Sequence, residues 1–290
     1  PFLNGPSTLL VCPGDQAPVW GRSPLLFVVH DVRRLAARET ARGRLEATYY
    51  RRVMKGGAGR ASQILTISEF SRTELIEHLK PRCPVSIVAE QPRDIELVPS
   101  EKIEGNPPDF LLVGALRGYK GIETAIDALG DSSETGDSGA AIVCVGDSEG
   151  DPGYVERIAR LATEADGRFR MTGWISDEEL RALYEACCGT VNPSTYEGYG
   201  LSVAESLAAG LPTIASDIPP HREIGGDAVL YFEPGDAGSL AGLMLRLSRD
   251  PARRAEMALA SRRRHLELLA TDRPWALALG ESIGEISDLR

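Results

Sequence analysis

The stretch from Thr190 to Ser216, TVNPSTYEGYGLSVAESLAAGLPTIAS, contains a strand, a loop, a helix and a second strand in sequence. Its two ends, 190–192 and 213–216, are short and carry β-branched residues, which favours buried strands. Between them, Leu201–Ala209 predicts a helix that Gly210 ends. A helix between two such strands is typical of a parallel sheet with crossover connections.

The same alternation continues over nearly the whole chain of 290 residues. We expect capping boxes at Ser71–Glu74 and Ser176–Glu179 to start helices, and a last helix over Trp275–Leu289. A further helix is expected over Lys120–Leu129. Strands are expected at Leu25–His30, Gln63–Ile67, Val85–Ala89, Phe110–Gly114, Ala141–Gly146 and Phe169–Thr172. These elements predict the α/β fold class.

A proline-rich segment without periodicity, Pro92–Pro108, separates two such series and predicts a linker. We therefore expect a partial N-terminal Rossmann-like domain with its linker over residues 1–108. A C-terminal Rossmann-like domain is expected over 109–272. Residues 273–290 are expected to form a helix that returns to the N-terminal domain.

The composition excludes several classes of protein. The net charge of −10 and the pI near 5.1 argue against bulk attraction to nucleic acid or anionic lipid. Arg262–Arg264 form a basic cluster that allows peripheral membrane contact at most, with a solvated helix face as the alternative. No apolar run reaches the ~18 residues of a membrane span, and no signal peptide is recognisable.

The five cysteines have no metal-ligand spacing and are odd in number. They predict inert core thiols in a reduced, cytoplasmic protein.

The loop Val113-Gly-Ala-Leu-Arg-Gly-Tyr-Lys-Gly121 joins a predicted strand to a predicted helix. Its glycines, Gly114 among them, would leave backbone N–H groups at the edge of the sheet, which suits phosphate. Arg117 and Lys120 oppose the helix dipole at a cost of about 0.3–1 kcal/mol. Two such cations in an acidic protein suggest a pyrophosphate ligand, and solvated surface charge is the alternative.

The opening stretch contains two carboxylates, Glu197 and Glu205, with seven residues between them. On the predicted helix, Glu205 has neighbours at three and four positions that are small and mostly apolar, so it should face inward. A buried carboxylate needs donors, and ribose hydroxyls would supply them. The alternative is a helical Glu whose carboxylate reaches solvent. The other carboxylate, Glu197, lies in the loop itself.

Taken together, these motifs resemble the family-4 retaining glycosyltransferases (glycosyl transferases group 1), which have the GT-B fold of two Rossmann-like domains. The resemblance rests on Gly173–Leu180, Glu197-Gly-Tyr-Gly-Leu201, Glu205, Gly210-Leu-Pro212 and Glu223–Asp227, with Val113–Gly121 as the phosphate loop. Phe27–Asp31 and Leu65–Ser71 are similar to two patterns of the N-terminal domain, and Trp275 to the start of the returning helix.

The resemblance implies a role for each matching residue. Glu205 would hold the ribose, and Lys120 with Arg117 would neutralise the diphosphate. His30 would reach the transferred sugar from the opposite domain. The base would lie near Trp174 and Ile175. Glu197 would lie beside the sugar, and the backbone of the following residues would contact sugar or phosphate: Gly198, Tyr199, Gly200 and Leu201.

The implied reaction is metal-independent hexosyl transfer with retention, through front-face attack and without a cofactor. The donor would be a GDP- or UDP-sugar, mannose-like, and the acceptor a glycan or a lipid-linked glycan. The absence of an Asp-x-Asp motif agrees with a metal-free route.

Three departures from the family pattern bear on this expectation. Ala115 and Tyr119 stand where the family often has Arg, for which Arg117 would compensate. The segment Glu90–Asp94 replaces the usual turn before the linker. The opening strand, glycine-rich loop and helix of the N-terminal domain have no counterpart, so that domain is expected to be incomplete.

Two alternatives therefore stay open. One is a non-catalytic or partner-dependent nucleotide-sugar-binding subunit, whose protein partner would complete the N-terminal domain. The other is a sugar-nucleotide epimerase on the same fold, for which the motif order fits less well.

Overall fold

The computed structural model describes residues 8–14, 16–36, 41–90, 92, 98, 109–130, 139–148, 151–271 and 275–288. The chain divides into two compact units. Unit 1 comprises residues 1–90 and 271–290, and unit 2 comprises residues 91–270. The domain limits expected from the sequence stay predictions, and most of the expected linker lies outside the described residues.

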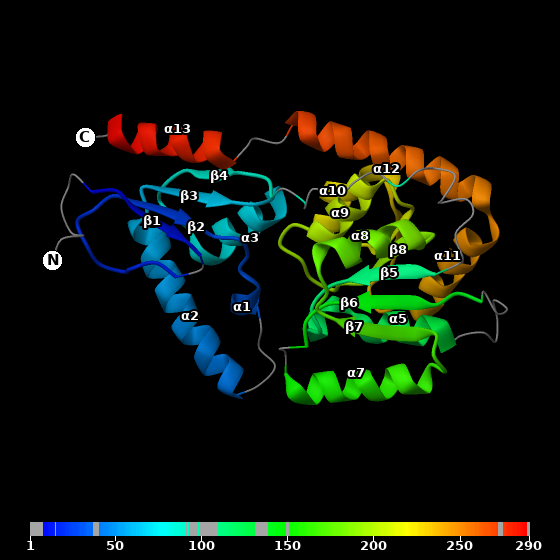
Figure 1. The fold of residues 1–290 in the computed structure, drawn as a ribbon. Coiled ribbons are helices and arrows are strands. Elements are labelled where there is room, and N and C mark those ends of the chain that lie inside the picture. The colour runs from blue at the N-terminus through cyan, green and yellow to red at the C-terminus, as the bar shows by residue number, and fades with distance from the viewer. Residues whose placement is uncertain are drawn as a thin grey trace. The chain divides into compact units, whose positions relative to one another are not determined.

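The described strands of unit 1 form a parallel sheet in the order β1-β2-β3-β4 (Figure 1). They are β1 (Leu10–Pro13), β2 (Leu25–Val28), β3 (Gln63–Thr66) and β4 (Val85–Ile87). The helices of this unit are α1 (Arg33–Ala36), α2 (Ala41–Arg60), α3 (Glu69–Leu79) and α13 (Trp275–Asp288).

Alternate residues of β2 face opposite sides of this sheet, as the two-residue period of a strand requires. Leu25 and Phe27 belong to a core shared with α2 and α3, whereas Leu26 and Val28 pack with Ala278 of α13. The last helix therefore returns to cover one face of the sheet of unit 1.

Two expectations for unit 1 need correction. The capping box at Ser71–Glu74 is wrong, because Ser68 is the N-cap of α3 and its hydroxyl accepts a hydrogen bond from the Ser71 N–H. The strand β1 was not expected, although it pairs with β2 over its whole length.

Unit 2 contains a parallel sheet whose described strands follow the order β10-β9-β8-β5-β6-β7 (Figure 1). The strands are β5 (Phe110–Val113), β6 (Ile142–Val145), β7 (Phe169–Gly173), β8 (Gly189–Asn192), β9 (Thr213–Ser216) and β10 (Leu230–Phe232). The chain runs outward from β5 to β7, returns to pair β8 with the other side of β5, and then continues outward to β10.

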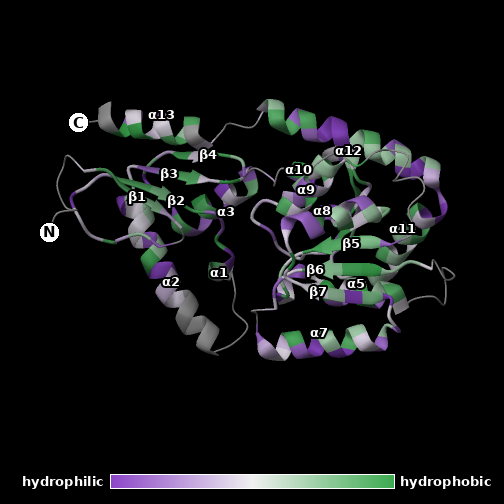
Figure 2. Cartoon of the chain, in the orientation of Figure 1, coloured by the Kyte–Doolittle hydropathy of each residue, from purple (hydrophilic) through white to green (hydrophobic). Residues whose placement is uncertain are grey.

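Helices cover both faces of this sheet. The helices are η1 (Gly118–Lys120), α5 (Ile122–Gly130), α7 (Pro152–Glu164), α8 (Asp177–Ala186), α9 (Leu201–Ala209), α10 (Pro219–Gly225), η2 (Gly226–Ala228), α11 (Ala237–Arg249) and α12 (Pro251–Thr271). Phe110 packs with α5, α7 and α11, whereas Leu111 packs with α8 and α12. Figure 2 shows β5 and β6 as hydrophobic and α7 as alternately hydrophobic and hydrophilic, as expected for a buried sheet under amphipathic helices.

The local signals in unit 2 are mostly confirmed. Ser176 and Glu179 form the predicted capping box, with both reciprocal hydrogen bonds present. The helix expected from Lys120 begins later, because Gly118–Lys120 form a 3₁₀ turn and α5 starts at Ile122.

Three of the five cysteines are core thiols, as expected. Cys144, Cys187 and Cys188 are buried, and burial raises the pKa of Cys144 and of Cys188 to about 12. Cys12 and Cys83 are only partly buried, in unit 1.

Candidate functional site

The strand order of unit 2 reverses between β5 and β8, which are neighbours in the sheet although two strands separate them in sequence. In open α/β sheets, ligands bind outside the carboxyl ends of the strands at such a reversal. The loops that leave β5 and β8 there contain Lys120 and Glu197, respectively. The sheet topology thus indicates Lys120 and Glu197, which the sequence motifs also indicate.

The two loops are fixed to each other by backbone contacts. The Thr195 N–H donates to the Tyr119 carbonyl at 2.7 Å. Gly121 has a φ of +64°, and a Cβ there would lie 2.0 Å from the Pro193 carbonyl oxygen. Glycine is therefore required at 121 by the backbone conformation and by the approach of the β8 loop.

Lys120 and Glu197 form an ion pair at the centre of this edge. Lys120 Nζ lies 2.7 Å from Glu197 Oε1, and the Ser194 hydroxyl donates to the same oxygen at 2.6 Å. The two charged side chains are only 17% and 12% exposed. An ammonium group has three hydrogens, so Lys120 keeps further donors for an anionic ligand.

Gly114 and Arg117 lie on the same β5 loop. A Cβ at Gly146 would overlap the Gly114 carbonyl at 2.0 Å, so the loops after β5 and β6 are also closely packed. Arg117 Nη2 lies 3.7 Å from Asp147 Oδ1, with both side chains more than a third exposed. Such a pair contributes about 0–1 kcal/mol, so the guanidinium can leave it at little cost.

The glycine-rich loop ends at the N-terminus of α9. Gly200 is the N-cap, with a φ of +101°, and as a glycine it makes no side-chain cap hydrogen bond to the first turn. Tyr199 is buried and Gly198 partly buried, whereas Leu201 is exposed. A helix N-terminus without a side-chain cap suits an anionic ligand.

Glu205 lies in α9 and is buried at 6% exposure, as its small neighbours on the helix predicted. The Tyr184 hydroxyl of α8 donates to its carboxylate at 3.4 Å. On the far side of the sheet edge, Trp174 follows β7 and is 79% exposed, while Ile175 packs against the core. The nucleotide-contact roles of these residues stay predictions.

His30 belongs to unit 1, whereas the other predicted site residues belong to unit 2. Its ring stacks on Trp275, with centroids 6.4 Å apart and 27° between the planes. Glu90 also lies near the imidazole: burial raises the pKa of that carboxyl, and the charge of His30 partly opposes the rise. The role expected for His30 toward the sugar stays a prediction.

Sequence reasoning missed His221, which is fully buried behind the glycine-rich loop. A Cβ at Gly200 would lie 3.3 Å from its Cδ2. The available signal was its position just after β9, because side chains that follow parallel strands meet at the same edge as Lys120 and Glu197.

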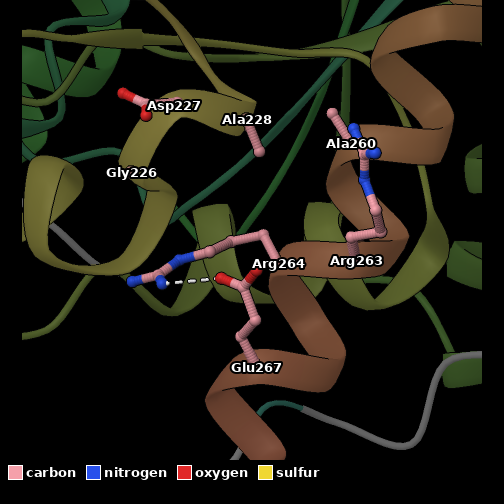
Figure 3. A pocket seen from close by; sticks show the side chains of 7 residues that line it. All are labelled: Gly226, Asp227, Ala228, Ala260, Arg263, Arg264 and Glu267. Carbon is pink, nitrogen blue, oxygen red and sulfur yellow. Dashed lines mark hydrogen bonds and ion pairs between the residues drawn. The ribbon is translucent and has the colours of Figure 1, made fainter.

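The basic cluster on α12 is largely used inside unit 2. Arg262 donates to the Val98 carbonyl, and Arg264 donates to the carbonyls of Glu223 and Ile224 at 2.7 and 2.8 Å. A hollow of about 440 Å³ is lined by Arg263, Arg264 and Glu267, among other residues. Figure 3 shows Arg264 directed toward Glu267, with which it forms an ion pair at 3.1 Å. Two of the three arginines therefore anchor other elements rather than form a free basic surface.

Neither a metal cluster nor a membrane span was found where the structure describes the chain. No group of three His, Cys, Asp or Glu side chains comes together there as a possible metal site. None of the described helices combines the length and apolar character that a membrane crossing requires.

Comparison with known proteins agrees with this geometry. The profile of the family "Glycosyl transferases group 1" matches residues 94–264, which is more than half of the chain. The chain belongs to this family. It is 26% identical over 210 residues to O-antigen chain mannosyltransferase B of Escherichia coli, covering 69% of this chain and 55% of that protein. It is also 30% identical over 171 residues to a glycogen synthase of Mycobacterium tuberculosis, covering 58% of this chain and 40% of that protein.

Comparison with solved structures confirms the GT-B fold. Sucrose-phosphate synthase of Thermosynechococcus elongatus matches with a TM-score of 0.74 and 22% identity, over 92% of this chain and 69% of that one. Anabaena HepE with UDP-glucose matches with a TM-score of 0.72 and 19% identity, over 93% of this chain and 73% of that one. The chain spans about half the length of the curated mannosyltransferases it matches, 55% and 58%.

Proposed function

We propose that this chain carries the donor site of a retaining, metal-independent hexosyltransferase. The donor is a GDP- or UDP-sugar of mannose type, and the acceptor is a glycan or lipid-linked glycan. A cytoplasmic location with at most peripheral membrane contact is part of the proposal. The observation that carries it is the half-buried Lys120–Glu197 pair at the sheet reversal.

The charges of this edge suit departure of a nucleoside diphosphate. Negative charge grows on the diphosphate as the glycosidic bond breaks, and a preorganised cation lowers that barrier. Lys120 supplies the cation, and the N-terminus of α9 follows the loop that contains its partner Glu197. Glu197 holds the ammonium in place and presents its carboxylate to the sugar.

The buried carboxylate in α9 gives the site its preference for a nucleotide. Glu205 is 6% exposed and has the Tyr184 hydroxyl as a long partner at 3.4 Å. A ribose would add hydroxyl donors to this acceptor. Retention at the anomeric carbon follows by front-face attack, with the acceptor arriving on the same side as the departing phosphate.

Thermal unfolding with GDP, UDP, ADP and TDP, and with their common sugars, tests the donor site. Ligand at about 100 times its Kd should stabilise the protein by about 2.7 kcal/mol. Each kcal/mol should raise the Tm by about 2–4 °C. We expect a shift with one nucleotide class, lost in Glu205→Gln and kept in Glu178→Gln, which changes an exposed residue of α8.

Transfer and donor hydrolysis by the same protein separate an enzyme from a binding subunit. Turnover with the stabilising donor, reduced in Lys120→Gln, supports the transferase. Stabilisation without any turnover would favour the partner-dependent subunit instead. No shift with any nucleotide would contradict both.

A further inference from the structure

His221 is the third residue of α10 and has no exposed surface. Its Nε2 atom has no hydrogen-bond partner among the residues that the structure describes. An unsatisfied buried polar atom costs about 1–3 kcal/mol, so a histidine at this position needs a physical explanation.

The contacts of the other ring nitrogen fix the tautomer. Nδ1 lies 3.0 Å from the main-chain carbonyl oxygen of Ser216 and 3.1 Å from the Ser216 hydroxyl. A carbonyl oxygen only accepts, so Nδ1 carries the hydrogen. Nε2 is then the lone-pair acceptor of a neutral imidazole.

From Ser216, further hydrogen bonds lead to the edge of the sheet that carries Lys120 and Glu197. The Ser216 hydroxyl donates to the Ser194 carbonyl, and the Ser194 hydroxyl donates to Glu197 Oε1 at 2.6 Å. The same carboxylate oxygen receives Lys120 at 2.7 Å. A chain of polar contacts thus joins the buried imidazole to the Lys120–Glu197 pair.

The imidazole also contacts the other end of the same loop. Gly200 has a φ of +101°, and a Cβ on it would approach His221 Cδ2 to 3.3 Å. The ring therefore lies against the residue that caps α9, while its Nδ1 branch leads to Ser194. Both ends of the segment 194–200 depend on one side chain.

We propose that His221 is a positioning residue of the donor site. Through its Nδ1 hydrogen it holds Ser216 and Ser194, which aim the Glu197 carboxylate at the transferred sugar, while its ring edge holds Gly200. That Glu197 faces the transferred sugar rests on the proposed function. The hydrogen bonds and contacts of His221 do not depend on it.

The burial of the ring agrees with a neutral imidazole. Burial lowers the pKa of His221, Glu197 opposes that shift, and Lys120 adds to it.

Two substitutions separate positioning from space-filling. His221→Asn keeps an N–H donor near the Nδ1 position and loses ring volume, whereas His221→Leu keeps an apolar volume and loses the donor. We expect His221→Leu to lower kcat by about tenfold or more with little change in donor KM, because small misplacements of a catalytic group are costly. His221→Asn should keep most of kcat. A Leu variant as active as the Asn variant would overturn the proposal.

A second readout does not need turnover. In protein labelled with ¹³C at the Glu carboxyl carbons, the Glu197 resonance, assigned through Glu197→Gln, should move in His221→Leu and in Ser216→Ala. It should stay in place in His221→Asn. If wild-type protein is inactive, the proposed function fails, and this resonance alone decides the positioning role. An unchanged resonance in the folded Leu variant overturns it.

Discussion

At the scale of single residues, Gly121 is constrained twice, by its positive φ and by the Pro193 carbonyl of the neighbouring loop. Gly121→Ala should therefore lower the free energy of unfolding by about 3 kcal/mol or more. Gly167→Ala is the matched control, because its φ of +75° is similar but nothing lies within 4 Å of a Cβ there. It should cost only about 1–2 kcal/mol. If urea unfolding gives the same loss of unfolding free energy for both variants, the close approach of Pro193 to Gly121 adds nothing to the cost.

The pH dependence of stability follows from the imidazole of His221. Its folded pKa lies below the ordinary value of 6.5, so the unfolded chain binds the proton first as pH falls. The stability present above pH 6.5 is then lost on acidification, by at most about 1.4 kcal/mol per pH unit for one proton.

The difference in unfolding free energy between wild-type protein and His221→Asn measures the pH-dependent stability that the imidazole contributes. We expect it to shrink as pH falls below about 6.5, whereas titrations common to both proteins cancel. Glu197 raises the pKa of His221, and Lys120 lowers it. In a Lys120→Gln background, the difference in unfolding free energy should therefore decrease less as pH falls. A difference that is independent of pH would mean that His221 is not held neutral by burial.

At the scale of elements, α10 is held at its C-terminal end by a side chain of α12. Arg264 donates to the carbonyls of Glu223 and Ile224, which are among the last residues of that helix. Since α10 carries His221, this contact also holds the helix on which the proposed positioning residue lies.

Arg264→Leu should cost about 2 kcal/mol, because hydrogen bonds from a charged donor are lost and two carbonyls remain. Arg263→Leu, its exposed neighbour in sequence, should change stability by no more than about 0.5 kcal/mol. Unfolding both variants in guanidinium chloride measures the change in unfolding free energy that each substitution causes. Equal effects would assign the loss to helix propensity instead of to the anchor.

Elements with strong local signals were predictable from the sequence. The Ser176 box works as expected, since all of its atoms lie within one helical turn. The predicted box at Ser71 is wrong because Ser68, three residues earlier and two residues after the end of β3, is the N-cap of the helix. The helix α10 was missed because Pro219 and Pro220 suggest a break, although proline is favoured in the first turn.

For the candidate site, the sequence predicted the position of a residue where one segment of the chain determines it, but not where the pairing of strands brings residues together. Glu205 follows from its own helix, and Lys120 from its own loop. His221 depends on Ser194 and Ser216, which pairing of β8 with β9 brings together. That register is a property of the whole sheet, so no local pattern revealed the contacts of His221 with Ser216 and the loop that carries Glu197.

At the scale of the whole molecule, the residues expected to bind the donor are divided unequally between the two units. Apart from His30, every residue assigned to the donor lies in unit 2. Hydrogen exchange of the whole chain can therefore report on each contribution separately, because amide protection follows local stability.

A nucleoside diphosphate should slow exchange in the segments 114–121 and 194–205 and leave the His30 segment of unit 1 unchanged. The intact nucleotide sugar should slow exchange in the same segments and additionally around His30, because only the sugar would reach that imidazole. His30→Ala should remove the additional protection without changing the affinity for the diphosphate. Glu77→Ala, at an exposed position of α3 in unit 1, should leave that protection intact. If the diphosphate alone protects the His30 segment, that residue responds to the nucleotide, and its expected role toward the sugar is wrong.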